Sequence, residues 1–410
     1  MIIKNTLLLT ISHILSRGSL ILSSIFVSSL MDKENFSIYS YFILTSTTIS
    51  IYSALGIGIT TSKSYTNFSK KVNDADSPIM TIWILNIIIS ILGGLLFILF
   101  SEKIIPNSIN LKSIYFSCLI IIMCIDIYAS NALIGLEKYI SLCISAFIFL
   151  IATLIAVYLS IVNNNIYYAI IGLIISSALQ LILHYAFLFI YLLKTNHLKK
   201  IKIKLEHFKE IFKTMGPMMF VSLFAASTTW IVGQYILSSE DNISLEFNLF
   251  SIGLQWFSLA VFLPSVFSRV LLNYFITHSH KDTLTIAKKN IYFIMSLFLL
   301  LSVLSYFLFP LIEKIYSKYN IPIILIPIFI LTAGINSSSN ILGNILISRN
   351  KEWSWLIIVM SGFIVMNICC LVSEKIDSIQ GAIFILANNI IILLISTLFF
   401  IKRNKKEELN

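Results

Sequence analysis

Long apolar stretches, separated by short charged or turn-rich segments, run through the whole chain. Each stretch has the length that an α-helix needs to cross the hydrocarbon core of a bilayer. The pattern therefore predicts a chain of transmembrane helices with short links between them. The twelve predicted spans are 6–30, 37–58, 79–101, 113–133, 139–161, 167–193, 215–237, 245–270, 291–311, 321–347, 353–372 and 380–401.

One predicted helix, from Leu245 to Leu271, has a polar face. Residues at alternating spacings of three and four lie on one side of an α-helix. Six of the seven residues on this line are polar. Because hydrocarbon offers them no hydrogen bonds, the face should look into protein or into a water-filled cavity. The line consists of Asn248, Ser251, Gln255, Ser258, Phe262, Ser265 and Arg269.

A repeat is visible at an offset of 208 residues, where Phe36–Phe42 aligns with Ser244–Phe250. Six predicted spans fit into this offset, so the second copy keeps the orientation of the first in the membrane. We therefore predict an all-α polytopic membrane protein of about twelve transmembrane helices in two six-helix bundles that face each other. Its predicted parts are an N-terminal lobe at 1–193, a basic link at 194–213, a C-terminal lobe at 214–402 and a polar tail at 403–410.

The composition supports this class and excludes several others. Of 410 residues, 58% are hydrophobic and 12% charged, and the mean hydropathy is +0.92, which points to a membrane protein. The five cysteines all lie in apolar runs without a CxxC pair, so we predict neither a metal site nor disulfide bonds. No phosphate-binding GxxxxGK[ST] loop occurs, and we expect no cofactor. The first span is too long for a signal-peptide core and should be retained.

The positive charges predict the orientation in the membrane. The net charge of +10 has its first explanation in topology, before any appeal to nucleic acid. Of the 29 lysines and arginines, 22 fall on one side of the predicted spans and six on the other, and Arg17 lies within a span. Because basic residues gather on the cytoplasmic side, both termini are predicted to be cytoplasmic.

Arg17 is the most unusual cation. It lies eleven residues into the first predicted span, about 17 Å at 1.5 Å per residue, near the centre of the bilayer. An isolated cation at that depth costs about 2.5–3.5 kcal/mol. Two interpretations stay open: a structural ion pair with Asp126, which is the only acid well inside a span, or a cavity cation that meets an anionic substrate. Asp126 itself either pairs or titrates in an ion-coupled cycle.

Other polar side chains form lesser candidates. Arg269 near the end of its helix either snorkels to the interface or faces the cavity. His184, four residues after Gln180, is more typical of a satisfied bundle histidine than of a proton carrier. Polar patches on other spans either join helices together or present neutral donors and acceptors, with an aromatic ring, to a sugar. The further candidate cavity residues are His13, Asn248, Gln255, Ser258, Trp230, Gln234 and Asn340.

At this point the chain resembles a known family in several short motifs. They are Leu30–Tyr41 with Ala54–Lys63, Ile134–Tyr139 after the fourth span, Phe212–Pro217 before the seventh, and Phe262–Arg269 closing the eighth. The sequence is similar to polysaccharide-biosynthesis flippases, the Wzx-type O-antigen translocases of the multidrug/oligosaccharidyl-lipid/polysaccharide exporter superfamily (MOP).

This resemblance implies two six-helix lobes around a V-shaped central cavity that opens alternately to either side. It also implies an undecaprenyl-pyrophosphate-linked oligosaccharide as substrate, with Arg17 and Arg269 on the helices where related flippases carry cavity arginines. This cavity holds few other cations, so a full arginine cluster is not carried over. The drug exporters of the superfamily use carboxylates on their first helix, and the first helix here has none.

The sequence thus favours a non-enzymatic transporter that moves a lipid-linked oligosaccharide across the bacterial inner membrane. A pyrophosphate bearing sugars cannot cross hydrocarbon unaided, whereas arginine binds phosphate bidentately. The expected partners are that substrate and, in the membrane, a polysaccharide polymerase and a chain-length regulator; nucleic acid is not expected. A membrane glycan polymerase ranks lower, because the longest outside links have only about a dozen residues. A drug antiporter ranks third.

Overall fold

The computed structural model describes residues 2–54, 56–70, 78–107, 109–194, 206–238, 245–277, 280–349, 351–373 and 375–407. Within these ranges the chain forms fourteen α-helices and no strand. It divides into two compact units, Met1–Ala226 and Ser227–Asn410. The boundary between them falls inside a helix, shortly after the predicted link at 194–213, most of which lies outside the described residues.

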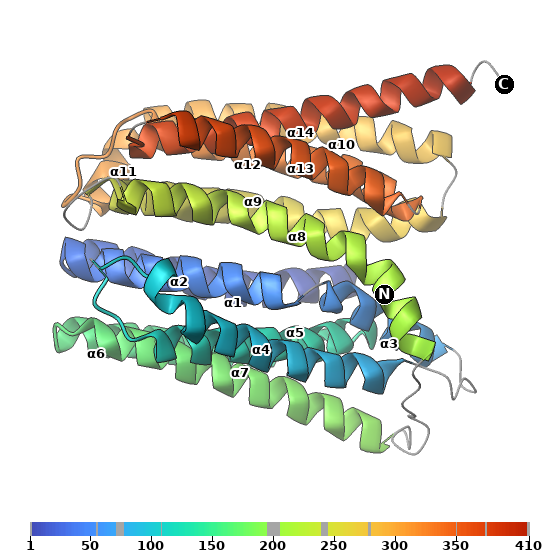
Figure 1. Ribbon diagram of the computed structural model, residues 1–410, viewed down its shortest axis with the longest axis horizontal. Coiled ribbons are helices and arrows are strands. Elements are labelled where there is room, and N and C mark those ends of the chain that lie inside the picture. Colours follow the sequence, from blue (N-terminus) through green and yellow to red (C-terminus); the bar gives the residue numbers. More distant parts are fainter. Residues whose placement is uncertain are drawn as a thin grey trace. The chain divides into compact units, whose positions relative to one another are not determined.

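The first unit contains seven complete helices and part of an eighth (Figure 1). They are α1 (Ile2–Leu30), α2 (Lys33–Ala54), α3 (Ile57–Lys70), α4 (Ile79–Ile104), α5 (Ser113–Gly135), α6 (Tyr139–Val162), α7 (Ile166–Lys194) and the start of α8 (Glu206–Ser238). The second unit holds the end of α8 with α9 (Leu245–Thr277), α10 (His280–Phe307), α11 (Phe309–Ile315), α12 (Leu325–Ser348), α13 (Glu352–Val372) and α14 (Ser378–Glu407).

Eleven helices of the described chain are long and apolar enough to cross a membrane, which confirms a multi-pass membrane protein. They correspond to all the predicted spans except the second. Helix α2 occupies that place but is rich in Ser, Thr and Tyr, and it is not among the eleven. The predicted span 37–58 was also displaced, because α2 (22 residues) begins at Lys33 and ends at Ala54, and Gly56 adopts a left-handed φ of 75° before α3 begins.

The ninth predicted span, 291–311, was wrong at its end. Helix α10 stops at Phe307, and a separate short helix, α11, starts at Phe309 with Pro310 in its first turn. Proline lacks a backbone N–H and fits the first turn of a helix better than its interior. The pattern of apolar residues runs through this break without a signal, because both helices are apolar.

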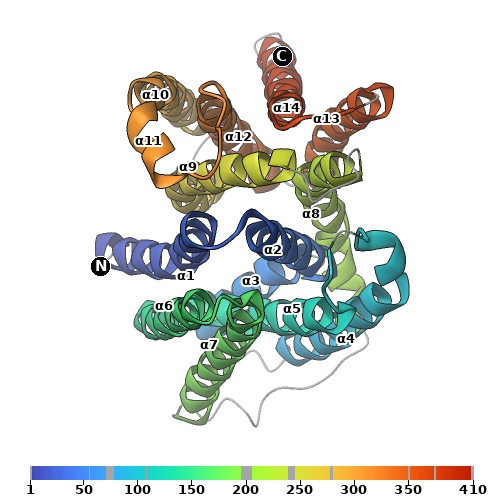
Figure 2. The same cartoon turned by 90° about the vertical axis from the view of Figure 1, so that its left-hand side faces the viewer.

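Each unit is built around one central helix (Figure 2). Helix α5 packs against α2, α3, α4 and α7 in the first unit, and α12 packs against α9, α10 and α14 in the second. The predicted repeat is visible in this packing. Phe42 of α2 meets Phe116 of α5 edge to face at 5.0 Å between ring centroids, and Phe250 of α9 meets Phe329 of α12 in the same way at 5.8 Å. The two six-helix pseudo-repeats are therefore confirmed.

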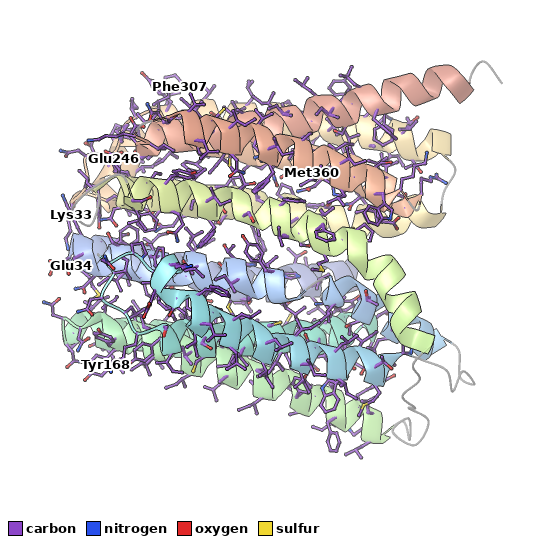
Figure 3. All side chains as sticks on the ribbon, in the orientation of Figure 1. Lys33, Glu34, Tyr168, Glu246, Phe307 and Met360 are labelled. Atoms are coloured by element: carbon purple, nitrogen blue, oxygen red, sulfur yellow. The ribbon has the colours of Figure 1, made fainter. Side chains whose placement is uncertain are left out.

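Small residues let the helices of a unit approach closely. A Cβ atom added at Gly172 of α7 would lie 2.0 Å from Cβ of Ala156 on α6. Such small-residue contacts replace the hydrophobic effect as a packing force between helices in lipid. At one end of the first unit lie Lys33 and Glu34, where α1 turns into α2, together with Tyr168 near the start of α7 (Figure 3). The predicted spans likewise place the link between the first and second spans and the start of the sixth span on one side of the membrane.

Candidate functional site

A chain of hydrogen bonds links three helices of the first unit. Oδ1 of Asp126 on α5 lies 2.6 Å from Nδ1 of His184 on α7. Nε2 of the same imidazole lies 2.6 Å from Oγ of Ser145 on α6. The Ser145 hydroxyl is also placed to donate to the carbonyl oxygen of Leu142, at 3.0 Å. We call Asp126, His184 and Ser145 the acid–histidine–serine chain.

This chain is mostly enclosed. The His184 side chain is 3% exposed and the Asp126 side chain 22% exposed, so the carboxylate is the more accessible end of the pair. The hydroxyl of Tyr185, the next residue after the histidine, accepts a hydrogen bond from Nε1 of Trp83 at 3.2 Å. Charged groups inside a membrane protein are costly and are usually paired. Asp126 on α5 is paired with His184, a residue of the same unit.

The alternative in which Arg17 pairs with Asp126 is therefore wrong. Arg17 lies on α1, its side chain is exposed, and no residue in the described part of the chain hydrogen-bonds or ion-pairs with it. His184, rather than an arginine, is the partner of the acid. The sequence placed His184 beside Gln180 on its own helix, but both of its partners come from other helices.

Arg17 does not point in the same direction as the exposed apolar residues of α1. Leu7, Ile11 and Leu22 are exposed and centre on the direction of Gly18. Since each residue turns a helix by about 100°, Arg17 faces about a quarter turn away from the centre of this group, although exposed Ile14 lies only about 60° from it. His13, one turn earlier and half-buried, shares this polar side. A guanidinium in such a position has the charge and the hydrogen-bond donors that an anion requires.

The polar line of α9 changes character along its length. Asn248, Ser251 and Gln255 are buried, and Oε1 of Gln255 accepts a hydrogen bond from the hydroxyl of Tyr316 at 2.9 Å. Beyond them, Ser258 and Ser265 are exposed. This face was predicted to look into protein or into a water-filled cavity. Its first half is buried in protein, and its second half is exposed. The side chain of Arg269 lies outside the described residues, although its backbone is helical.

A second polar cluster joins α12 and α14. Nδ2 of Asn336 donates to Oδ1 of Asn389 at 2.8 Å, and Nδ2 of Asn340 donates to Oδ1 of Asn336 at 3.0 Å. Asn389 is buried and Asn340 is exposed, so the amides lead from the interior of the second unit to its surface. On α8, Trp230 and Gln234 are half-buried.

Sequence reasoning missed Ser145 and Asn389. Each lies in a mostly apolar helix among a few other polar residues, so only the packing of neighbouring helices shows its role. Within the described residues, no three His, Cys, Asp or Glu side chains gather in a way that could hold a metal ion.

Residues 2–242 match the sequence model of a family described as "Polysaccharide biosynthesis protein". This chain belongs to that family. The match covers more than half of the chain and includes all of α1 to α8, so the acid–histidine–serine chain and Arg17 lie inside it. A search of curated proteins finds no match.

Solved transporters share the fold over nearly the whole length. An inward-facing multidrug resistance MATE family transporter of the MOP superfamily is 12% identical, with a TM-score of 0.76 over 97% of this chain and 96% of its own. A mutant of the Vibrio cholerae MATE transporter VcmN is 14% identical, with a TM-score of 0.70 over 98% and 96%. An outward-facing MATE family transporter is 12% identical, with a TM-score of 0.67 over 99% and 97%.

These comparisons confirm the resemblance drawn from the sequence. The chain is a polysaccharide biosynthesis family member with the two-lobed, all-helical fold of MOP-superfamily transporters. At this low sequence identity the solved structures establish only the fold. The family match links the chain to polysaccharide biosynthesis. Together they support a membrane exporter rather than a soluble enzyme of the same pathway class.

Proposed function

We propose that this protein flips undecaprenyl-pyrophosphate-linked polysaccharide repeat units, of the O-antigen type, from the cytoplasmic to the periplasmic leaflet of the bacterial inner membrane. The observation that carries the proposal is Arg17: an exposed guanidinium, deep in α1, that no acid of the described chain neutralises. The family match and the transporter fold support the same class of substrate and the same class of activity.

The physical task suits these residues. The pyrophosphate and hydroxyls of the substrate would lose their water in hydrocarbon, which forbids unaided crossing. A guanidinium matches two phosphate oxygens at once, so Arg17 binds the pyrophosphate, and Arg269 on α9 is proposed to assist it. The prenyl tail stays in lipid while the headgroup passes between the six-helix lobes 1–193 and 214–402, which open alternately to the two sides. No covalent chemistry is required.

Exposed neutral side chains contact the sugars in this proposal. Ser258 on α9 and Asn340 on α12 are exposed and carry hydrogen-bonding groups. Trp230 offers an aromatic surface to a sugar ring, with Gln234 one turn further along α8. His13 lies beside Arg17 on α1. By contrast, Asn248 and Gln255 are buried, so they act through the packing of the polar face unless the unit opens during the cycle.

Deletion of the gene tests the proposal. Without a flippase, single lipid-linked repeat units accumulate on the cytoplasmic leaflet and surface polysaccharide disappears. Without a polymerase, single units still reach the surface and cap the lipid A core, and only the long chains vanish. That one-unit pattern would overturn the proposal. Unchanged polysaccharide together with a new sensitivity to cationic drugs would indicate a drug antiporter instead.

The proposed surroundings follow from the same function. Both termini, the link at 194–213 and the tail at 403–410 are placed in the cytoplasm by their lysines and arginines. On the periplasmic side a polysaccharide polymerase and a chain-length regulator would receive the flipped units, and these are the proposed protein partners.

A further inference from the structure

We propose that Asp126, His184 and Ser145 form a binding site for one proton, and that its occupancy drives the transport cycle. The binding site stands on its own geometry, whereas its link to transport rests on the function proposed above. The mechanism of headgroup binding does not use these residues. Two of them, Asp126 and His184, nevertheless form an ion pair.

Counting hydrogens shows how the site accommodates an extra proton. The hydroxyl of Ser145 has one hydrogen, and its oxygen is placed to give that hydrogen to the carbonyl of Leu142. When the hydroxyl is turned this way, Nε2 of His184, 2.6 Å from the same oxygen, donates to it. Nδ1, 2.6 Å from Oδ1 of Asp126, also needs a proton between the two atoms. A carboxylate and a neutral imidazole together hold one proton too few for this arrangement.

The state without the extra proton needs only one small movement. The hydroxyl of Ser145 turns from the Leu142 carbonyl to Nε2, which now accepts, while Nδ1 still donates to Asp126. Proton binding reverses this: the lone pair of Nε2 forms an N–H bond with the incoming proton, and the hydroxyl turns back to Leu142. No group leaves, and the net charge of the site changes from −1 to zero.

That charge change is what links the proton to the conformation. Ser145 is fully buried and His184 nearly so, and an uncompensated carboxylate in such a place is costly. The protonated, neutral site therefore favours the closed packing of α5, α6 and α7 described here. Loss of the proton favours an arrangement in which Asp126 gains water. The two states of the site thus bias two states of the unit.

The surrounding titratable groups do not compete for this proton near neutral pH. Tyr185 on α7, Tyr65 on α3, and Tyr128 and Cys124 on α5 lie in the same cluster. The phenols of α2 bond elsewhere, Tyr39 to Ser23 and Tyr41 to the carbonyl of Ile104, and the thiol of Cys143 on α6 contacts the carbonyl of Leu8. Phenols and thiols lose their protons above neutral pH, whereas an imidazole changes its charge close to it.

The proton site is tested without any transport substrate. The full-length protein is labelled with ¹⁵N-histidine in lipid nanodiscs, and the ring nitrogens are followed by NMR from pH 4 to 9, with His184→Gln to assign the signal. We expect one titration step in which both nitrogens of His184 become protonated. In Asp126→Asn the doubly protonated ring should be absent under the conditions where the parent protein shows it, because its carboxylate partner has been removed.

His13→Gln, which removes the other histidine of the first unit's described spans, is the matched control and should leave this step unchanged. Asp126→Asn keeps the size of the side chain, and its melting temperature is measured beside that of the parent protein. A His184 signal that stays in one neutral tautomer over the whole pH range would overturn the site.

The link to transport is tested in proteoliposomes with an imposed pH gradient and a fluorescent prenyl-pyrophosphate-linked N-acetylhexosamine. We expect a pH gradient to accelerate flipping by the parent protein, and Asp126→Asn to flip at a rate that the gradient does not change. A full response of Asp126→Asn to the gradient would overturn the coupling. A titrating His184 in a parent protein that flips nothing would support the proton site and sink the proposed function.

Discussion

Oδ1 of Asp126 lies 2.6 Å from Nδ1 of His184, so the acid is paired without Arg17. Arg17 and Asp126, which both lie well inside membrane spans of the first unit, therefore have different roles. Asp126 belongs to a closed network of three helices. Arg17 stands on the polar side of α1 with an exposed side chain.

The first prediction concerns Arg17 and follows from that separation. Arg17→Ala should abolish polysaccharide display while protein abundance stays normal, because Asp126 keeps its histidine partner. Arg17→Lys keeps the charge but loses the planar fork, so we expect partial activity. The double swap Arg17→Asp with Asp126→Arg should fail, since it breaks the pair with His184 and places an acid where the anion binds.

Surface polysaccharide and membrane protein level are measured together for these variants. Lys33→Ala removes an exposed cation from the end of the unit and should leave display unchanged, which makes it the control for net charge. Full display by Arg17→Ala at normal abundance would remove Arg17 from the substrate site.

The second prediction separates packing from binding along α9. Tyr316→Phe removes the hydrogen bond to buried Gln255 and should cost about 1–3 kcal/mol of stability, seen as an apparent melting temperature lower by a few degrees. Ser258→Ala is exposed and should change stability by less than about 0.5 kcal/mol but reduce transport. Both properties are measured on detergent-purified protein and in cells. The opposite pattern, a stable Tyr316→Phe and an unstable Ser258→Ala, would contradict this division.

The third prediction tests the closest helix contact. Gly172→Ala brings two Cβ atoms to 2.0 Å and should destabilise the protein by about 1–3 kcal/mol. Ala156→Gly on the opposite helix restores the space, so the double variant should recover most of the lost melting temperature. Gly18→Ala, which would meet no atom within 4 Å, is the matched control and should be neutral or slightly stabilising. Equal effects of the two glycine changes would show that helix propensity, and not close packing, sets the stability.

The fourth prediction concerns the orientation in the membrane. The five native cysteines are first replaced, and single reporter cysteines are then placed in the link at 194–213 or in the tail at 403–410. Both reporters should resist a membrane-impermeant maleimide in intact cells. Lys33→Cys, at the opposite end of α1 from the N-terminus, should react. Labelling of the link and the tail from outside would reverse the topology.

Much of the fold followed from the sequence because a membrane imposes one strong rule on it. A helix needs about twenty apolar residues to cross, so the length of each apolar stretch located the helices. The break at Gly56 was missed because a single glycine in an apolar run carries no periodic signal. The break before Pro310 was missed because the helices on both of its sides are apolar.

The site was harder to predict for a different reason. Helical spacing tells which side of one helix is polar, but it does not tell which other helix that side meets. Asp126 was therefore matched to the only cation within a span, although His184 lies closer in the fold. The buried first half of the α9 line and its exposed second half likewise share one period, and only packing separates them.

The hydroxyl-rich composition of α2 bears on how the protein is made. This helix is the least apolar of those that occupy predicted spans. Its buried serines and threonines would find no hydrogen-bond partners in lipid. Its main packing partner, α5, is synthesised some sixty residues later. We therefore expect α2 to stay beside the insertion machinery, or to enter the bilayer as a hairpin with α1, until α5 emerges from the ribosome and shields its polar side.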